Sequence, residues 1–257
     1  MLMVLSPAKK LDYDTPVRTT RRSLPVFPDD TRKLARVLRR LSAGDLAELM
    51  GLSDALARLN AARYADWVDE PDTAHARQAV LAFNGDVYEG LRAAELSDAQ
   101  LDWAQDRLAI LSGLYGVLRP LDLVQPHRLE MGTRLRTARG ATLYEFWGER
   151  IARELNRRLD ALAGERVLLN LASGEYFKSV DRKALRARVV ECVFQDEKNG
   201  AWKVISFHAK RARGLMARHV IDRRIEAPGD LRGFAAEGYA YAPEASSDDR
   251  LVFRRPA

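Results

Sequence analysis

The stretch RVLLNLASGEYFK, residues 166–178, joins a short apolar run to a dense group of polar side chains. Its first part, 166–172, is bounded by polar residues, which is typical of a central strand buried on both faces. In open α/β sheets ligands bind at the loops that follow the strands, so the second part is a candidate binding site. The alternative is structural, with a helix cap followed by core aromatic residues. The candidate side chains of this loop are Ser173, Glu175, Tyr176 and Lys178.

A second loop of the same kind follows the apolar run 1–5. That run is too short for a signal-peptide core or a membrane span, and we expect it to form a buried first strand. Ser6, Lys9 and Lys10 come directly after it, and lysines at a strand end attract phosphate. A solvated turn with two exposed lysines is the alternative.

The remaining periodicities predict a mixture of helices and strands. Apolar spacing and capping patterns predict helices at 34–41, 42–50, 53–67, 73–83, 97–108, 143–162 and 209–224. Apolar and β-rich runs predict further strands at 108–114, 189–194, 202–207 and 251–253. The dipeptide formed by Asn199 and Gly200 suits a type I′ hairpin between two of them. With no repeat and no long linker, we expect one compact domain over 1–257, an α/β (or α+β) fold with a mixed β-sheet surrounded by helices.

Composition favours a polyanionic partner, although only weakly. The 42 basic and 36 acidic side chains give a formal net charge of +6 and a pI near 9.5. The basic residues gather in three parts of the chain, at 9–22, 32–40 and 198–224. Cys192 is the only cysteine, which excludes an internal disulfide and a cysteine-based zinc cluster and favours a reducing compartment, the cytoplasm.

The four histidines lie far apart, without metal-ligand spacing, so we expect each at the surface or at a helix cap. The sequence therefore predicts no metal site and no cofactor.

The segment from the hairpin into the following helix is the third candidate site. Lys198 is expected at the turn, with Lys210, Arg211 and Arg213 at the start of the helix. Helix N-termini offer free N–H groups to anions, and arginines bind phosphate in a bidentate manner, so the segment is a candidate phosphate clamp. An exposed helix face that is simply basic is the alternative.

The fourth candidate is the tight turn Met50, Gly51, Leu52 and Ser53 between two short helices, with Arg63 on the second helix. In helix-hairpin-helix modules such a turn holds a DNA phosphate through backbone amides. With one glycine the motif is degenerate, and an ordinary corner between two helices explains the pattern equally well.

Several strings of residues, in order along the chain, resemble the YaaA peroxide stress family. They are SPAK at 6–9, LDY at 11–13, FNGDVY at 83–88, LSGLYGVLRPLD at 111–122, YEFWG at 144–148, residues 170–180 and DEKNG at 196–200. The resemblance implies a compact fold special to that family, a positively charged cleft and a helix-hairpin-helix-like element at 46–67. It also implies binding to duplex or structured DNA and protection when peroxide meets intracellular iron.

Carried over residue by residue, the resemblance implies a set of cleft residues. We expect the cations of this set to bind phosphates, and Tyr176 and Glu175 to orient them. Lys10 and Gly174 depart from the family strings, where a threonine and an acid are common. The set comprises Ser6, Lys9, Arg119, Arg128, Arg134, Lys178, Lys198, Lys210 and Arg213.

Three functions follow as hypotheses. The first is a monomeric, non-enzymatic DNA-binding protein with no catalytic residue. The second is an enzyme acting on a small phosphorylated or nucleobase-like ligand, with Ser6, Lys9, Ser173, Glu175 and Lys178 in one pocket. The third, which no spacing supports, is iron binding by oxygen ligands such as Asp12, Asp14, Glu175 and Asp196.

Overall fold

A mixed β-sheet forms the centre of the computed structural model, which describes all residues from Met1 to Ala257. The eight strands of the sheet run in the order β11-β12-β9-β8-β1-β5-β6, with β10 paired to β9. The five strands from β12 to β5 are parallel to one another, whereas β6, β10 and β11 are antiparallel to their neighbours. Two short ribbons, β2 with β4 and β3 with β7, lie outside the sheet.

The strands are β1 (Leu2–Leu5), β2 (Lys10–Leu11), β3 (Arg77–Gln78), β4 (Phe83–Asn84), β5 (Leu108–Ser112), β6 (Gly116–Leu118), β7 (Leu123–Val124), β8 (Val167–Asn170), β9 (Arg188–Lys198), β10 (Ala201–Lys203), β11 (Ala240–Tyr241) and β12 (Arg250–Arg255). The α-helices are α1 (Pro28–Arg39), α2 (Ala43–Met50), α3 (Asp54–Ala65), α4 (Ala79–Ala82), α5 (Asp86–Leu91), α6 (Asp98–Arg107), α7 (Leu143–Trp147), α8 (Arg150–Asp160), α9 (Gly174–Phe177) and α10 (Ser206–Arg223). Three 3-10 helices, Ala93–Glu95, Pro228–Gly233 and Pro243–Ala245, complete the fold.

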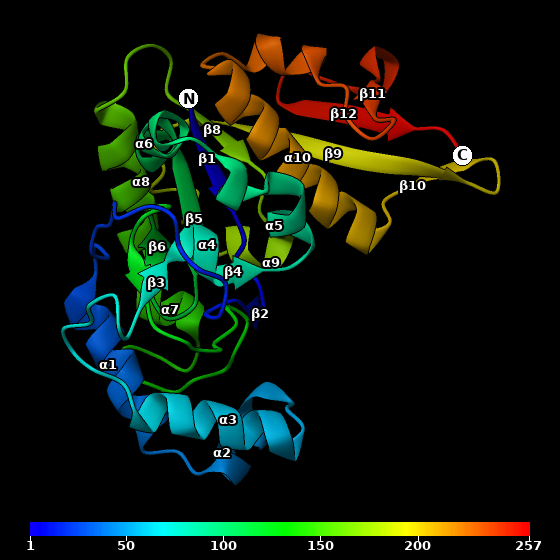
Figure 1. Cartoon of the computed structure of the whole chain (residues 1–257). Coiled ribbons are helices and arrows are strands. Elements are labelled where there is room, and N and C mark those ends of the chain that lie inside the picture. Colours follow the sequence, from blue (N-terminus) through cyan, green and yellow to red (C-terminus); the bar gives the residue numbers. More distant parts are fainter.

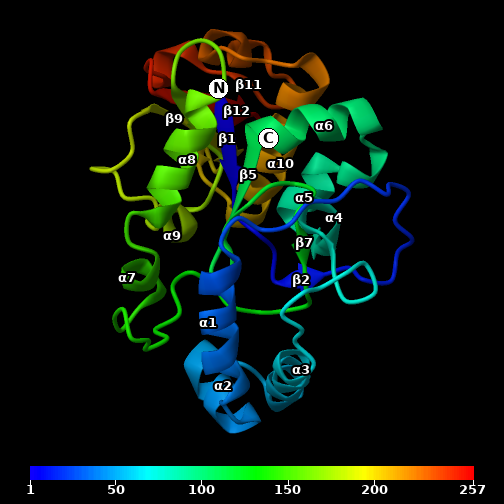
Figure 2. The ribbon, with the colours of Figure 1, turned by 90° about the vertical axis from the view of Figure 1, so that its left-hand side faces the viewer.

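Helices cover both faces of the sheet, as expected for the central strands β1, β5 and β8, whose residues are all buried (Figures 1 and 2). Helices α5, α6 and α10 lie on one side of β1 and β5, and α7, α8 and α9 lie on the other. Helices α2 and α3 form a separate pair at the end of the molecule away from β11 and β12 in both views.

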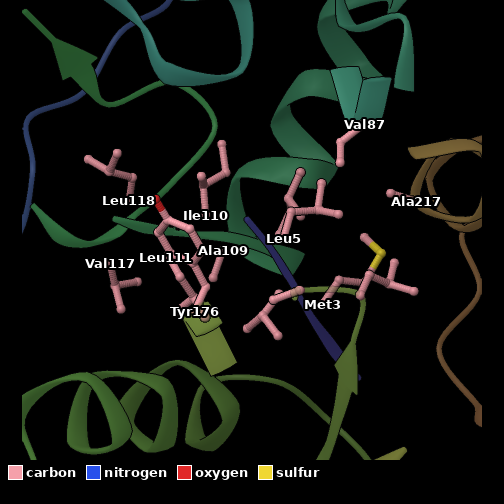
Figure 3. Packing of buried hydrophobic residues seen from close by; sticks show 14 of the residues in the cluster. Met3, Leu5, Val87, Ala109, Ile110, Leu111, Val117, Leu118, Tyr176 and Ala217 are labelled. Carbon is pink, nitrogen blue, oxygen red and sulfur yellow. The ribbon is translucent and has the colours of Figure 1, made fainter. Parts of the chain in front are cut away.

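One continuous cluster of buried apolar residues runs from Met1 to Phe253 and includes Leu34, Leu46 and Tyr64 from the first three helices. Figure 3 shows its centre, where side chains of β1 and β5 meet those of the covering helices. The expected α/β architecture around a mixed sheet is therefore confirmed. No helix combines the length and the apolar character that crossing a membrane requires.

Local sequence signals located many elements correctly. Ser42 and Asp45 form a capping box at the start of α2, and Ser97 and Gln100 form one at α6. Asn199 and Gly200 both have positive φ, of 56° and 71°, as the hairpin between β9 and β10 requires.

Three expected elements were wrong. The predicted helix 73–83 is instead a turn followed by β3, the four-residue helix α4 and β4. The predicted helix 143–162 is two helices, because Gly148 ends α7 with a φ of 47°. The predicted strand 202–207 pairs only at β10, and α10 already begins at Ser206.

Candidate functional site

The two strand-end loops singled out in the sequence meet at the centre of the sheet. Strands β1 and β8 are parallel neighbours, so their carboxyl ends open at the same edge. The Ser6 Oγ accepts a hydrogen bond from the Ser173 backbone N–H at 2.9 Å and lies 3.3 Å from the Ser173 Oγ. From β1 the chain next enters the sheet at β5, whereas from β8 it next enters at β9, toward the other edge of the sheet. In open α/β proteins, ligands bind at the point where the strand order changes direction in this way.

A cavity of about 300 Å³ opens at this edge, and we call it the strand-end cavity. Its walls come from β2, β4, α5, α9, α10 and the loop after β7, which Figure 1 shows around the lower end of β1. The cavity is lined by residues 6–10, 83–87 and 127–130 together with Ser112, Leu171, Ser173, Glu175, Tyr176, Lys210 and Arg213.

Five cations line the cavity, and two of them share one carboxylate. The Glu130 carboxylate forms ion pairs with the Lys9 ammonium at 2.9 Å and with the Arg128 guanidinium at 3.2 Å. Lys10 and Lys210 are exposed and form no ion pair within the chain. Together with Arg213 they leave three cations of this wall available to an anion.

Arg213 is the most informative of the three because it is partly buried. It forms no hydrogen bond or ion pair within the chain, and burial lowers the pKa of its guanidinium. An unpaired cation removed from water carries a desolvation cost, which a bound anion would offset.

The loop after β8 supplies a carboxylate and a phenol. The Glu175 Oε1 accepts a hydrogen bond from the Gly132 N–H at 2.9 Å, which fixes the carboxylate at the cavity wall. Tyr176 is buried against Leu111 of β5 (Figure 3), and burial raises the pKa of its phenol, so it stays neutral. Glu175 therefore borders the cavity, as the interpretation as a binding site requires. Tyr176 belongs largely to the core, as the structural alternative requires.

His127 is a cavity residue that the sequence reasoning missed. It is buried, contrary to the expectation of a surface or capping position, and desolvation lowers the pKa of its imidazole to about 4. Its Nδ1 lies 2.8 Å from the Gln125 carbonyl oxygen, so Nδ1 carries the proton and Nε2 is an acceptor. Asn84, Asp86 and Glu130 were missed as well, although FNGDVY at 83–88 was among the family strings and was the available signal.

Of the fourteen expected phosphate-site residues, the cavity gathers Ser6, Lys9, Lys10, Arg128, Ser173, Glu175, Tyr176, Lys210 and Arg213. Five others do not line it. Arg119 is held by the fully buried Asp122 at 2.9 Å, and Arg211 pairs with Glu237, so both serve structural contacts. Arg134 and Lys198 are exposed, and the Lys178 Nζ lies over the Tyr144 ring at 5.0 Å from its centroid. Lys9 and Lys178 thus do not share the pocket that the enzyme hypothesis required.

The turn between α2 and α3 has the expected local geometry. Gly51 adopts the left-handed conformation with a φ of 60°, and Ser53 is the N-cap residue of α3 without a side-chain capping bond. Tyr64 at the end of α3 donates to the Arg128 carbonyl oxygen at 2.7 Å, which links this helix pair to the cavity wall. Arg63 is partly buried and does not line the cavity. The helix-hairpin-helix assignment of this turn and its binding of DNA both stay predictions.

The structure contains no group of three or more His, Cys, Asp or Glu side chains placed to hold a metal ion. Asp12, Asp14, Glu175 and Asp196 therefore do not form the cluster that the iron hypothesis needs. The Asp196 carboxylate is instead bound by Arg255 and by the Tyr239 hydroxyl at 3.0 Å.

Comparisons with known proteins agree with the sequence strings. UPF0246 proteins of Bordetella petrii and Bordetella pertussis are each 64% identical to this chain, over 100% and 99% of both chains respectively. A UPF0246 protein of Burkholderia mallei is 60% identical over 100% of this chain and 99% of its own length. A family model described as peroxide stress protein YaaA matches residues 1–245. This chain therefore belongs to the YaaA family of peroxide stress proteins.

Proposed function

We propose that this protein acts in the peroxide stress response by binding the phosphate backbone of duplex or structured DNA in the cytoplasm. The observation that carries the proposal is the meeting of cations from distant parts of the chain. Lys10 from the first loop and Lys210 and Arg213 from α10 line one cavity without an ion pair. Unpaired cations that displace counterions from phosphates are the main source of affinity for DNA.

The size of the cavity limits how DNA would lie. At about 300 Å³ the strand-end cavity is far too small for a duplex, so the backbone would cross its rim. Exposed cations outside the cavity, Arg134, Lys178 and Lys198, would extend the contact along the backbone. The α2–α3 turn would add a backbone contact through its amides.

The salt dependence of DNA binding tests this proposal. Replacing Lys198, Lys210 and Arg213 together with alanine should reduce the slope of log K against log salt by about 3, since each lost phosphate contact removes about 1. Fluorescence anisotropy with a fully paired duplex, measured over a series of salt concentrations, gives the slope.

A matched variant controls for the loss of charge. Arg153, Arg157 and Arg186 are exposed, but each is ion-paired, to Glu149, Glu154 and Asp160 respectively. Replacing these three with alanine removes the same number of positive charges and should leave the slope unchanged. If the two triple variants show equal slopes, the assignment of the unpaired cations to DNA is wrong.

A further inference from the structure

The buried wall of the strand-end cavity holds an acceptor that no group of the chain uses. His127 packs edge-on against Tyr115 and Phe83, with ring centroids 5.2 Å and 6.2 Å away, and its Nδ1 is committed to the Gln125 carbonyl. These contacts fix the orientation of the imidazole. Its Nε2 has no hydrogen-bond partner within the chain and is not among the enclosed unpaired atoms, so it opens on the cavity that His127 lines. An N–H group of a ligand in the cavity can therefore donate a hydrogen bond to it.

The unpaired cations on the exposed wall of the same cavity favour binding of an anion. Arg213 and Lys210 project from successive turns of α10 and lack ion pairs, and Lys10 faces the same space. The cavity therefore has two kinds of binding group, which are cations on the side toward solvent and the neutral His127 Nε2 acceptor on the side toward the core. Phe83, Leu129 and Leu171 provide apolar surface in the same lining.

The balance of charge restricts the anion. The lining carries five cations and three carboxylates, Asp86, Glu130 and Glu175, which leaves a formal excess of two positive charges. A phosphate monoester, with a charge of about −1.5 to −2 at neutral pH, matches that excess. A triphosphate would meet repulsion from the carboxylates. The volume of about 300 Å³ lies at the lower end of the range for small-ligand sites.

We propose that the strand-end cavity binds a single nucleotide unit, with its phosphate at Arg213 and Lys210 and with an N–H of its base donating to the His127 Nε2. The apolar lining around Phe83 accommodates the planar base, and the carboxylates accept hydrogen bonds from sugar hydroxyls or amino groups. The nucleotide comes either from the free pool, as a monoester, or from a nucleic acid that extrudes one nucleotide from its stack, where the two flanking phosphodiesters carry one negative charge each. The inference does not depend on backbone binding by the outer cations.

Calorimetric titration of the full chain with free ligands is the first test. The probes are AMP, GMP, CMP and UMP, with adenosine and inorganic phosphate as fragments. At least one nucleoside monophosphate should bind at least about tenfold more tightly than either fragment, because only it engages both walls. Phosphate binding as tightly as every nucleotide would overturn the proposal.

Two substitutions test the contributions of the two cavity walls to nucleotide binding separately. Arg213→Met and His127→Phe should each weaken binding of that nucleotide by at least about tenfold, since each removes one partner of a desolvated ligand group. Arg223→Met, on the exposed end of the same helix, and His75→Phe, in an exposed turn, are the matched controls and should bind as the parent does. Equal affinity in all four variants would contradict the proposed pose. Thermal unfolding without ligand confirms that each variant is folded.

A second arm distinguishes the source of the nucleotide. A duplex with one bulged nucleotide is compared with the same duplex fully paired. Tighter binding of the bulged duplex that is lost in His127→Phe supports an extruded nucleotide, even if free monophosphates do not bind. If no monophosphate binds and the bulge has no effect, the proposal fails. Binding of the fully paired duplex, which the Lys198, Lys210 and Arg213 variant probes, is a separate readout and its failure removes only the backbone proposal.

Discussion

At the residue scale, the most unusual group is the neutral imidazole of His127. Desolvation by its buried position is the main cause of the lowered pKa, and the nearby Arg63 charge acts in the same direction. The hydrogen bond to the Gln125 carbonyl opposes the shift but does not cancel it. At neutral pH the side chain is therefore a fixed, uncharged acceptor rather than a cation.

This imidazole predicts a specific dependence of stability on pH. Its pKa of about 4 in the folded chain lies below the 6.5 of an ordinary histidine, so the unfolded chain binds the proton more tightly. The contribution of the neutral His127 imidazole to the free energy of unfolding is complete above about pH 6.5, falls as the pH decreases and is lost below about pH 4. Between pH 7.5 and 5.0 the parent should lose about 2 kcal/mol more unfolding free energy than His127→Phe does.

Urea denaturation of both proteins at the two pH values measures this difference. Carboxylates with lowered pKa values, such as Asp30 and Glu237, contribute equally to both proteins and cancel. The same loss in His127→Phe as in the parent would show that the imidazole does not titrate in this way.

At the element scale, the contact between α5 and α10 positions the cationic wall of the cavity. Gly90 of α5 and Gly214 of α10 both lie in this contact, each against the backbone of the opposite helix. A Cβ on Gly214 would lie 1.8 Å from the Val87 carbonyl oxygen, and one on Gly90 would lie 2.2 Å from the Arg211 carbonyl oxygen. Only glycine permits this approach, which places Lys210 and Arg213 opposite the loop after β1.

Gly214→Ala should therefore destabilise the protein and displace α10. We expect a loss of about 1–3 kcal/mol in unfolding free energy, the usual cost of forcing extra atoms into a packed contact. Chemical denaturation measures the loss. Gly229→Ala is the matched control, because a Cβ at Gly229 meets nothing within 4 Å, and it should change the stability little. A fully stable Gly214→Ala protein would mean that the two helices separate without cost.

Elements with a strong local signal were predictable, and those without one were not. The capping boxes of α2 and α6 and the turn at Asn199 and Gly200 depend on neighbouring residues alone. The segment 73–83 was wrong because its residues pair with distant strands. Gln78 lies opposite Leu123, and Phe83 lies opposite Leu11, so tertiary pairing overrides the helical spacing.

Across the whole molecule, just over half of the basic residues form ion pairs, and the location of the unpaired ones decides the electrostatics. Arg211 illustrates this, since the sequence placed it in the phosphate clamp and the structure pairs it with Glu237 and Glu89. The formal net charge of +6 therefore says less than the location of the cations that lack a partner.

Removing unpaired cations should not weaken the fold. The variant with Lys198, Lys210 and Arg213 replaced by alanine has a formal net charge of +3, three less than the +6 of the parent. We expect a Tm equal to that of the parent or slightly higher at low salt, because no ion pair is lost and the desolvated Arg213 charge is relieved. Differential scanning calorimetry at low and high salt checks this, and a Tm decrease of several degrees would show that these cations serve the fold.

Local apolar runs, turn residues and family strings were sufficient to predict the architecture, the first and central strands, the hairpin and the family, because these signals need no distant partner. The sequence also identified the loops of Ser6 and Ser173, since the carboxyl ends of parallel strands lead to one edge. The three-dimensional contacts were needed to learn which cations remain free and that His127 is buried. Ion pairs and desolvation depend on contacts between residues far apart in the chain, so local sequence patterns do not predict them.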